Sequence, residues 1–293
     1  MKNKLSLFAV PYVGWMSIFV VAPIIIMVVY AFSTAAGDFT LENFARMGTY
    51  TAVFTRSFKL AIIATLIALL IGYPVSYMLS KEGPQVQRIA MVLIMLPMWM
   101  NFLLRTYSWM SILENNGLLN RLFQSIGLID LYNQIAMSLS ANPAAYEPIT
   151  HFQLINTQGA VVLGMVYNYL PFMILPIYSV LVKLDHSLIE AARDLGASSV
   201  QVFRKVILPL SLPGVLSGIT MVFVPSVSTF AISRLLGGGT QMMLGDLIEQ
   251  QFLGGAYNPQ LGAAIALVMM AIVVVCMLVM NRFGDGEEQA VML

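Results

Sequence analysis

The residues of this chain that could perform chemistry are few and widely separated. The chain has two histidines, His151 and His186, and one cysteine, Cys276. None of the three has a second His or Cys at the spacing of a metal site. No G-x-x-x-x-G-K-[ST] sequence occurs, so the usual loop that holds nucleotide phosphates is missing. We therefore expect no catalytic residue, no metal site and no cofactor in this chain, and any energy source must lie in a partner.

One polar segment, 184–205, stands out in a chain that is otherwise strongly apolar. Ser187 followed by Glu190 predicts a capping box that starts a short helix. Gly196 predicts the end of that helix, with the glycine in the left-handed region. A second box, Ser198 with Gln201, predicts a second helix that continues into a hydrophobic stretch. The first helix has one apolar stripe, formed by Leu184, Leu188, Ala191, Ala192 and Leu195.

The elements that position this segment are membrane helices. Hydrophobic residues make up 59% of the chain and charged residues 10%, which excludes an ordinary soluble protein. Each apolar stretch is near the roughly 20 residues that cross a bilayer. We predict an all-α integral membrane protein, one transmembrane domain over residues 1–293, with six spans at approximately 7–32, 57–80, 88–113, 158–182, 206–232 and 260–280.

The positive charges predict the orientation of these spans. With both termini in the cytoplasm, nine Lys and Arg residues fall in the inner segments and four in the outer loops. The polar segment 184–205 then lies in the cytoplasm, and the long loop 114–157 lies outside. In that loop we expect one short interfacial helix followed by a flexible strip.

The spans lack acidic side chains, and this absence limits the mechanism. None of the six predicted spans contains Asp or Glu, whereas ion-coupled carriers usually need an ionisable group at mid-depth. Arg105 is the one deep charge. It lies 17 residues beyond Arg88, or some 25 Å at about 1.5 Å per residue. We expect its guanidinium to reach the outer membrane surface.

The polar segment resembles the EAA loop of ABC importer permeases, whose pattern is E-A-A-x3-G-x9-I-x-L-P. The match begins at Glu190, and the single departure is Val206 in place of Ile. The resemblance implies the type I, MetI-like permease fold, with the first short helix as a cytoplasmic coupling helix that docks on an ATP-binding subunit. The coupling residues that it implies are Glu190, Ala191, Ala192, Arg193, Asp194 and Gly196.

Other segments resemble the bacterial spermidine/putrescine permeases, in particular their B subunits. These segments are "KLDHSLIEAARDLGAS", "LIALLIGYPVSYMLS", "NFLLRTYSWMSIL" and "LLGGGTQMMLGDLIEQQFL". The resemblance implies a non-catalytic, multi-pass subunit in the bacterial cytoplasmic (inner) membrane. Its partners would be a second related permease, two copies of an ATPase that binds ATP and Mg, and an extracytoplasmic polyamine-binding protein. No basic tract suggests a nucleic-acid partner.

A polyamine is a flexible polycation, which favours aromatic faces and carboxylates. The residues that offer such groups along the pathway are Tyr107, Trp109, Tyr167, Tyr169, Asp246 and Glu249. Trp and Tyr also occupy membrane interfaces for reasons unrelated to a substrate. Because no span holds an acid, we expect weak polyamine binding in the membrane, with selectivity set mostly by the external binding protein.

Two alternatives differ from this interpretation. The chain could be an ABC permease for another solute, such as sulfate or ferric iron, because those permeases have a similar loop. It could also be a self-sufficient channel or carrier, in which case solute would cross without an ATPase.

Overall fold

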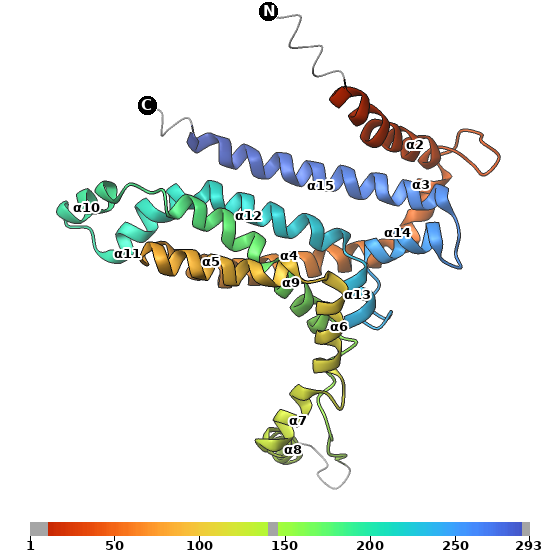
Figure 1. Cartoon of the computed structure of the whole chain (residues 1–293). Helices are drawn as coiled ribbons and strands as arrows, with labels where there is room; N and C mark the ends of the chain where they lie inside the picture. Colours follow the sequence, from red (N-terminus) through yellow and green to blue (C-terminus); the bar gives the residue numbers. More distant parts are fainter. Residues whose placement is uncertain (1–10, 140–145, 289–293) are drawn as a thin grey trace, which may run out of the picture.

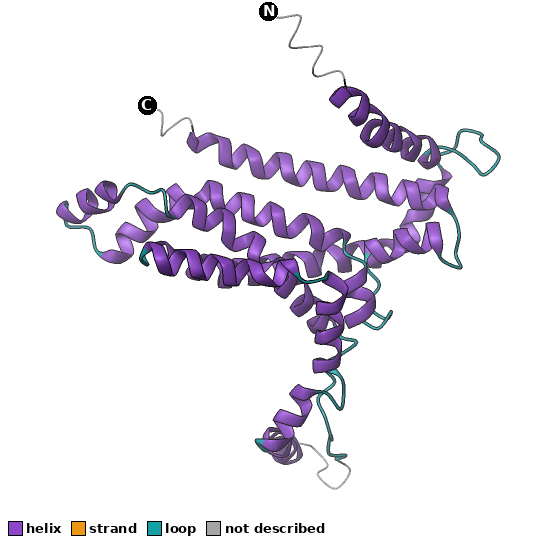
Figure 2. Cartoon of the chain, viewed as in Figure 1, coloured by secondary structure: helices purple, strands orange, loops and turns teal. Residues whose placement is uncertain are grey.

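The computed structural model describes residues 11–139 and 146–288, and in this part of the chain nearly every segment is helical (Figures 1 and 2). The one pairing outside the helices is an isolated bridge between Ser33 and Phe39. The predicted all-α class is therefore confirmed. Residues 7–10 of the first predicted span, and residues 140–145 of the predicted flexible strip, lie outside the described residues.

The long helices form the bundle and the short ones connect it. The first half contains α2 (Ala22–Ala31), α3 (Glu42–Arg46), α4 (Thr51–Ser80), α5 (Pro84–Trp99), α6 (Phe102–Leu113), α7 (Leu118–Ser125) and α8 (Leu128–Leu139). The second half contains α9 (Gln158–Leu181), α10 (His186–Asp194), α11 (Ser199–Val202), the π-helix η4 (Phe203–Ile207), α12 (Leu208–Ser228), α13 (Ala231–Leu236), α14 (Leu244–Leu253) and α15 (Pro259–Glu288).

Within residues 11–139 and 146–288, five continuous helical stretches are long and apolar enough to cross a membrane. They are Pro11–Ala31, Glu42–Ser80, Gln158–Leu181, Ser199–Ser228 and Pro259–Met280. Each of them overlaps one of the spans predicted from the sequence. A sixth crossing exists only if a sharply bent pair of helices is counted as one span.

That bent pair covers the predicted third span, 88–113, so this stretch is two helices and not the one helix expected. The helix pair that includes α5 and α6 bends by 90° at Met100 and Asn101. Met100 is extended, with ψ 150°, and the Asn101 side chain accepts hydrogen bonds from the backbone N–H groups of Leu103 and Leu104 at 2.9 and 3.3 Å. An asparagine cap of this kind starts a new helix in a new direction.

The fifth predicted span also ends early. α12 stops at Ser228 because Thr229 is extended, with φ −65° and ψ 142°, and α13 begins two residues later. The expected helix over 206–232 is therefore two helices.

Three helices, α4, α9 and α12, pack closely at the centre of the bundle. Glycines make this approach possible. A Cβ at Gly72 would lie 2.9 Å from Met173 Cγ, and one at Gly218 would lie 2.8 Å from Met173 Sδ. A Cβ at Gly214 would lie 2.8 Å from the carbonyl oxygen of Pro176. Small residues at helix crossings are typical of membrane bundles, where close packing replaces the hydrophobic effect.

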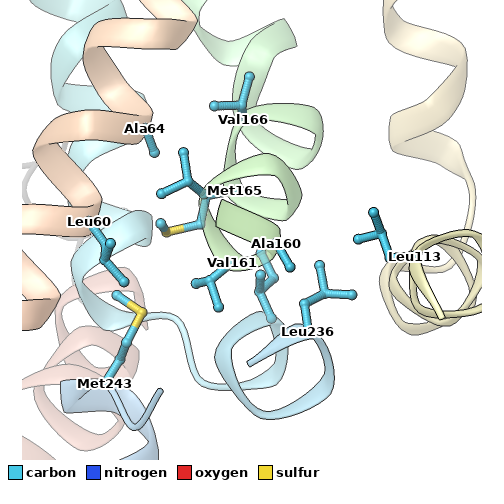
Figure 3. Packing of buried hydrophobic residues seen from close by; sticks show 11 residues of the cluster. Leu60, Ala64, Leu113, Ala160, Val161, Met165, Val166, Leu236 and Met243 are labelled. Atoms are coloured by element: carbon cyan, nitrogen blue, oxygen red, sulfur yellow. The ribbon is translucent and has the colours of Figure 1, made fainter. Parts of the chain in front are cut away.

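A second packing centre joins the short helices to this bundle (Figure 3). Leu60 and Ala64 from α4 meet Met165 from α9, and Leu236 from α13 closes the cluster on another side. α13 is thereby fixed against α9 at the end of the bundle opposite α10 (Figure 1).

The loop 114–157 contains two helices where one was expected. α7 and α8 are separated at Gly127, whose φ of +72° is left-handed and ends α7. Asn120 holds the returning chain, because it accepts a hydrogen bond from the N–H of Phe152 at 2.9 Å and donates one to the Phe152 carbonyl at 3.0 Å.

Candidate functional site

Residues 184–205, which we predicted to be a coupling segment and refer to by that name, project beyond one end of the bundle (Figure 1). Its first helix is α10. The Asp185 side chain accepts a hydrogen bond from the Ser187 N–H at 2.9 Å, and this bond to the backbone is the main cause that lowers the pKa of Asp185. The predicted box of Ser187 with Glu190 is therefore wrong. Asp185 takes the cap, so Ser187 is already the second residue of the helix.

Gly196 makes the turn as predicted, with a φ of +80°. The N–H of Gly196 donates to the Arg193 carbonyl at 2.8 Å, and the N–H of Ala197 donates to the Ala192 carbonyl at 3.1 Å. This pair of bonds is the Schellman motif. The second capping box is confirmed too, because Ser198 and Gln201 exchange both hydrogen bonds.

The predicted apolar stripe of α10 is divided between two faces. Leu184, Ile189 and Ala192 pack against the protein's own core. Leu188 is 49% exposed, Leu195 is 89% exposed, and Ala191 is exposed between them. The spacing explains the division, because residues 188, 191 and 195 recur at i, i+3 and i+7 on one side of a helix.

The outward residues of α10 form a small apolar surface with a charged rim. We call Leu188, Ala191 and Leu195, with Glu190, Arg193 and Asp194, the α10 face. All six are exposed. Depletion of charge at the centre and polar groups at the edge are features of protein–protein interfaces. Among the predicted coupling residues, Ala192 faces inward and Gly196 forms the turn.

The aromatic pathway candidates are partly brought together. The rings of Trp109 on α6 and Tyr167 on α9 meet edge to face, with centroids 5.3 Å apart and an interplanar angle of 68°. Tyr169 is half-buried and packs at the junction of two core clusters. Tyr107 lies on another face of α6 and is 46% exposed.

Arg105 contradicts the expectation that it reaches the membrane surface. Its side chain is buried, with 8% of the residue exposed. Its Nε and Nη1 atoms have no hydrogen-bond partner among the described residues. The 90° bend before α6 sets the direction of this helix, which packs against α9 and α13. Tyr169 lies within electrostatic reach of the guanidinium.

The two acidic candidates lie on α14 and are held by neighbouring groups. Asp246 is buried, and its Oδ2 accepts hydrogen bonds from Ser233 Oγ at 2.5 Å and from the Met243 N–H at 3.0 Å. Arg234 on α13 pairs with Glu249, and its Nε lies 3.8 Å from Asp246 Oδ1. Burial is the main cause that raises the pKa of Asp246.

No pattern in the sequence indicated the contacts of Arg234 and Ser233, because these residues lie on a different helix from the carboxylates. Among residues 11–139 and 146–288, no three His, Cys, Asp or Glu side chains are placed to hold a metal ion.

Comparison with known proteins identifies the fold. The chain is 36% identical over 285 residues to the "Spermidine/putrescine transport system permease protein PotB" of Haemophilus influenzae, with 93% of each chain covered. It is 34% identical over 281 residues to the protein of that name in Escherichia coli, covering 93% of this chain and 95% of the relative. A bacterial ABC transporter involved in the import of the acidic polysaccharide alginate has the same fold, with a TM-score of 0.76 at 16% identity over 97% of this chain and 96% of that one.

The fold is thus that of the MetI-like ABC importer permeases, as the EAA-type segment led us to expect. Residues 68–286, which include the coupling segment, match the family described as "Binding-protein-dependent transport system inner membrane component". This chain belongs to the family of binding-protein-dependent transport system inner membrane components.

Proposed function

We propose that this chain is the membrane permease subunit of an ATP-driven importer of spermidine, putrescine or both. The polyamine assignment is supported by relatives that carry this name and align over 93% of the chain. The ATP-driven mechanism is supported by one structural observation, the α10 face, whose leucines the bundle leaves uncovered.

The α10 face is the proposed docking surface for the ATPase. A nine-residue helix such as α10 has marginal stability in water without a partner. Burying Leu188 and Leu195 in a cleft of the ATPase would stabilise the contact, while Ala191 lets the two backbones approach closely. Glu190, Arg193 and Asp194 supply the polar rim.

The remaining partners are proposed from the family to which the chain belongs. Two copies of the ATPase bind ATP and Mg, and this chain is non-catalytic and holds no cofactor of its own. A second related permease completes the pathway as a heterodimer, and an extracytoplasmic polyamine-binding protein delivers the substrate. In this orientation α10 and both termini lie in the cytoplasm.

The substrate pathway is proposed to use the aromatic residues Trp109, Tyr167, Tyr169 and Tyr107. Trp109 and Tyr167 are the strongest pair, because their rings already share one site between α6 and α9. Tyr169 is weaker, since the nearby Arg105 guanidinium repels a cationic substrate.

The carboxylates Asp246 and Glu249 are also proposed pathway groups. In the structure both lie near Arg234, so a polyamine would have to compete with that guanidinium. This competition favours weak and transient binding in the membrane.

The test is transport by the whole assembly. This chain would be reconstituted in proteoliposomes with the second permease, the ATPase and the polyamine-binding protein, and uptake of labelled spermidine measured. We expect uptake only with ATP on the ATPase side and the binding protein on the other side. Unlabelled putrescine should compete, and sulfate and ferric complexes should not.

Two results would contradict the proposal. Competition by an oxyanion or by ferric iron, without competition by polyamines, would assign the permease to another solute. Solute flux through this chain alone, without the ATPase, would identify a self-sufficient channel or carrier.

A further inference from the structure

Phe203 lies in the coupling segment and contacts the central helix α4. Its ring centroid is 5.8 Å from that of Tyr73 at an interplanar angle of 88°, and 5.6 Å from that of Tyr77 at 69°. Both contacts are edge to face, the arrangement that aromatic rings favour over face-to-face stacking. The ring of Phe203 therefore meets two tyrosines one helical turn apart on α4.

The two tyrosines are held in place from other directions. The Tyr73 hydroxyl lies 2.9 Å from the Ser211 hydroxyl on α12, and Ser211 is fully buried. The Lys81 ammonium lies 3.8 Å from the centroid of the Tyr77 ring, a cation–π contact at the end of α4. A displacement of Phe203 therefore acts on α4 directly, and on α12 both along the continuous helix that η4 forms with it and through Tyr73.

α10 connects to the bundle mainly through the part of the chain that contains Phe203. Its principal helix contacts within the described residues are with α11 and η4. The inward side chains Ile189 and Ala192 pack on the same core cluster as Phe203.

Between α10 and the end of α4 a cavity of about 30 Å³ remains, lined in part by Tyr77, Lys81 and His186. A space of this size holds about one water molecule. The packing there is incomplete, so the close-packed route from α10 to α4 runs through η4.

We propose that Phe203 is a positioning residue, whose ring packs against Tyr73 and Tyr77 and passes the movement of α10 to α4 and α12. We call this contact of three rings the clasp. The proposal rests on the proposed function, because the movement of α10 comes from the docked ATPase. Protein interiors are dense and transmit displacement well. Removing the ring would leave a void into which the coupling segment could move while α4 stayed in place.

The test compares ATP hydrolysis with spermidine uptake in the same proteoliposomes holding the full assembly. Phe203→Ala leaves the α10 face unchanged, so we expect ATP hydrolysis within about twofold of the wild type. The spermidine imported per ATP should fall about tenfold or more, the size of a typical coupling effect. Phe203→Tyr keeps the ring edges and should retain the wild-type ratio. Val200→Ala, at a 66% exposed position of the same segment, is the matched control.

A distance measurement separates transmission from a general loss of structure. Spin labels at Val200→Cys on α11, outside the α10 face, and at Met78→Cys on α4, both exposed positions, would be placed in a Cys276→Ser background. With the clasp intact, the distance between the labels should stay narrow and unchanged when ATP replaces ADP. In Phe203→Ala it should broaden and depend on the nucleotide.

Each outcome decides the proposal. If Phe203→Ala keeps both the uptake ratio and the narrow distance, the clasp is wrong. If that variant does not assemble, Tyr77→Leu removes one of the two contacts and should give a severalfold fall in the ratio, and an unchanged ratio would again overturn the clasp. If the wild-type assembly shows no ATP-dependent uptake, the proposed function fails, whatever the distances show.

Discussion

The end of the bundle that carries α10 leaves leucines exposed, whereas the end that carries α13 and α14 buries the carboxylate of Asp246. Leu195 is 89% exposed at the first end, and Asp246 is 4% exposed at the second. Exposed leucines outside the apolar spans cost free energy until another protein covers them. Buried carboxylates cost free energy unless the chain itself supplies hydrogen bonds and a counter-charge, as Ser233 and Arg234 do here. The α10 end therefore presents an uncovered apolar surface, whereas the α13–α14 end holds a buried carboxylate in contacts from its own chain.

The largest effect should come from breaking the turn at the α10 end. Gly196 has a φ of +80° and open space around its Cβ position, so Gly196→Val strains only the backbone. We expect ATP-driven uptake to fall about tenfold or more if α10 loses its orientation, with normal insertion of the chain into the membrane. Uptake would be measured in membranes that hold the full assembly.

Gly83→Val is the matched control for this change. Gly83 also has open space around its Cβ position, but its φ of −68° suits any residue. Uptake by Gly83→Val should equal that of the wild type. Wild-type uptake by Gly196→Val would show that the turn is not needed for transport.

The next effect concerns the exposed leucine itself. Burying a leucine side chain is worth about 1.5–3 kcal/mol, so Leu195→Ser should weaken ATPase binding by about tenfold or more. Binding of the purified ATPase to the permease pair in nanodiscs would measure this change. Leu139→Ser is the control, because Leu139 is similarly exposed at 81% but lies in the long loop on the other side. If the Leu195 and Leu139 variants bound the ATPase equally well, Leu195 would not belong to the interface with the ATPase.

Arg105, at the α13–α14 end, is buried without a hydrogen-bond partner for Nε and Nη1 among the described residues. A buried charge without a partner costs free energy that an apolar side chain of similar size does not. We expect Arg105→Met to raise the apparent melting temperature of the purified protein. Arg121→Met, at an exposed position, should leave it unchanged. A lower melting temperature for Arg105→Met would show that Arg105 gains a partner in the intact protein.

The smallest effect should be the change in the free energy of unfolding with pH that Asp246 causes. Burial raises the pKa of Asp246, so the folded state binds this proton more tightly than the unfolded state does. Asp246 therefore adds to the free energy of unfolding at pH values below its pKa in the unfolded state. This contribution is lost as the pH rises through its pKa in the folded state. Relative to Asp246→Asn, the wild type should become less stable across that range, by no more than about 1–3 kcal/mol.

Melting curves of wild type and Asp246→Asn between acidic and alkaline pH would check this direction. Glu249→Gln, which removes the other partner of Arg234, serves as the comparison. If the wild type gained stability relative to Asp246→Asn as the pH rose, the ion pair with Arg234 would outweigh the burial of Asp246.

The same difference between the two ends explains what the sequence could predict. Gly196, Ser198 and Gln201 act on their own backbone within a few residues, so their roles were visible in the order of the chain. The choice of Asp185 over Ser187 as the cap was a local ambiguity, since both are short polar residues before the same apolar positions.

Contacts between helices were not visible in this way. The burial of Arg105 depends on the bend at Met100 and Asn101, and hydropathy alone passes over a break inside an apolar stretch. The pairing of Arg234 with Asp246 depends on how α13 and α14 pack after an intervening loop. The apolar composition predicted that a bundle exists, and the side-chain packing decides where its charges lie.

The glycines at the centre of the bundle fix the point at which three of its helices meet. Gly72 on α4 and Gly218 on α12 both press against Met173 of α9, which is fully buried. Helices pinned at one point cannot slide along each other, but they can tilt about it. If these helices tilt as rigid bodies about Met173, their ends on the two sides of that contact move in opposite directions.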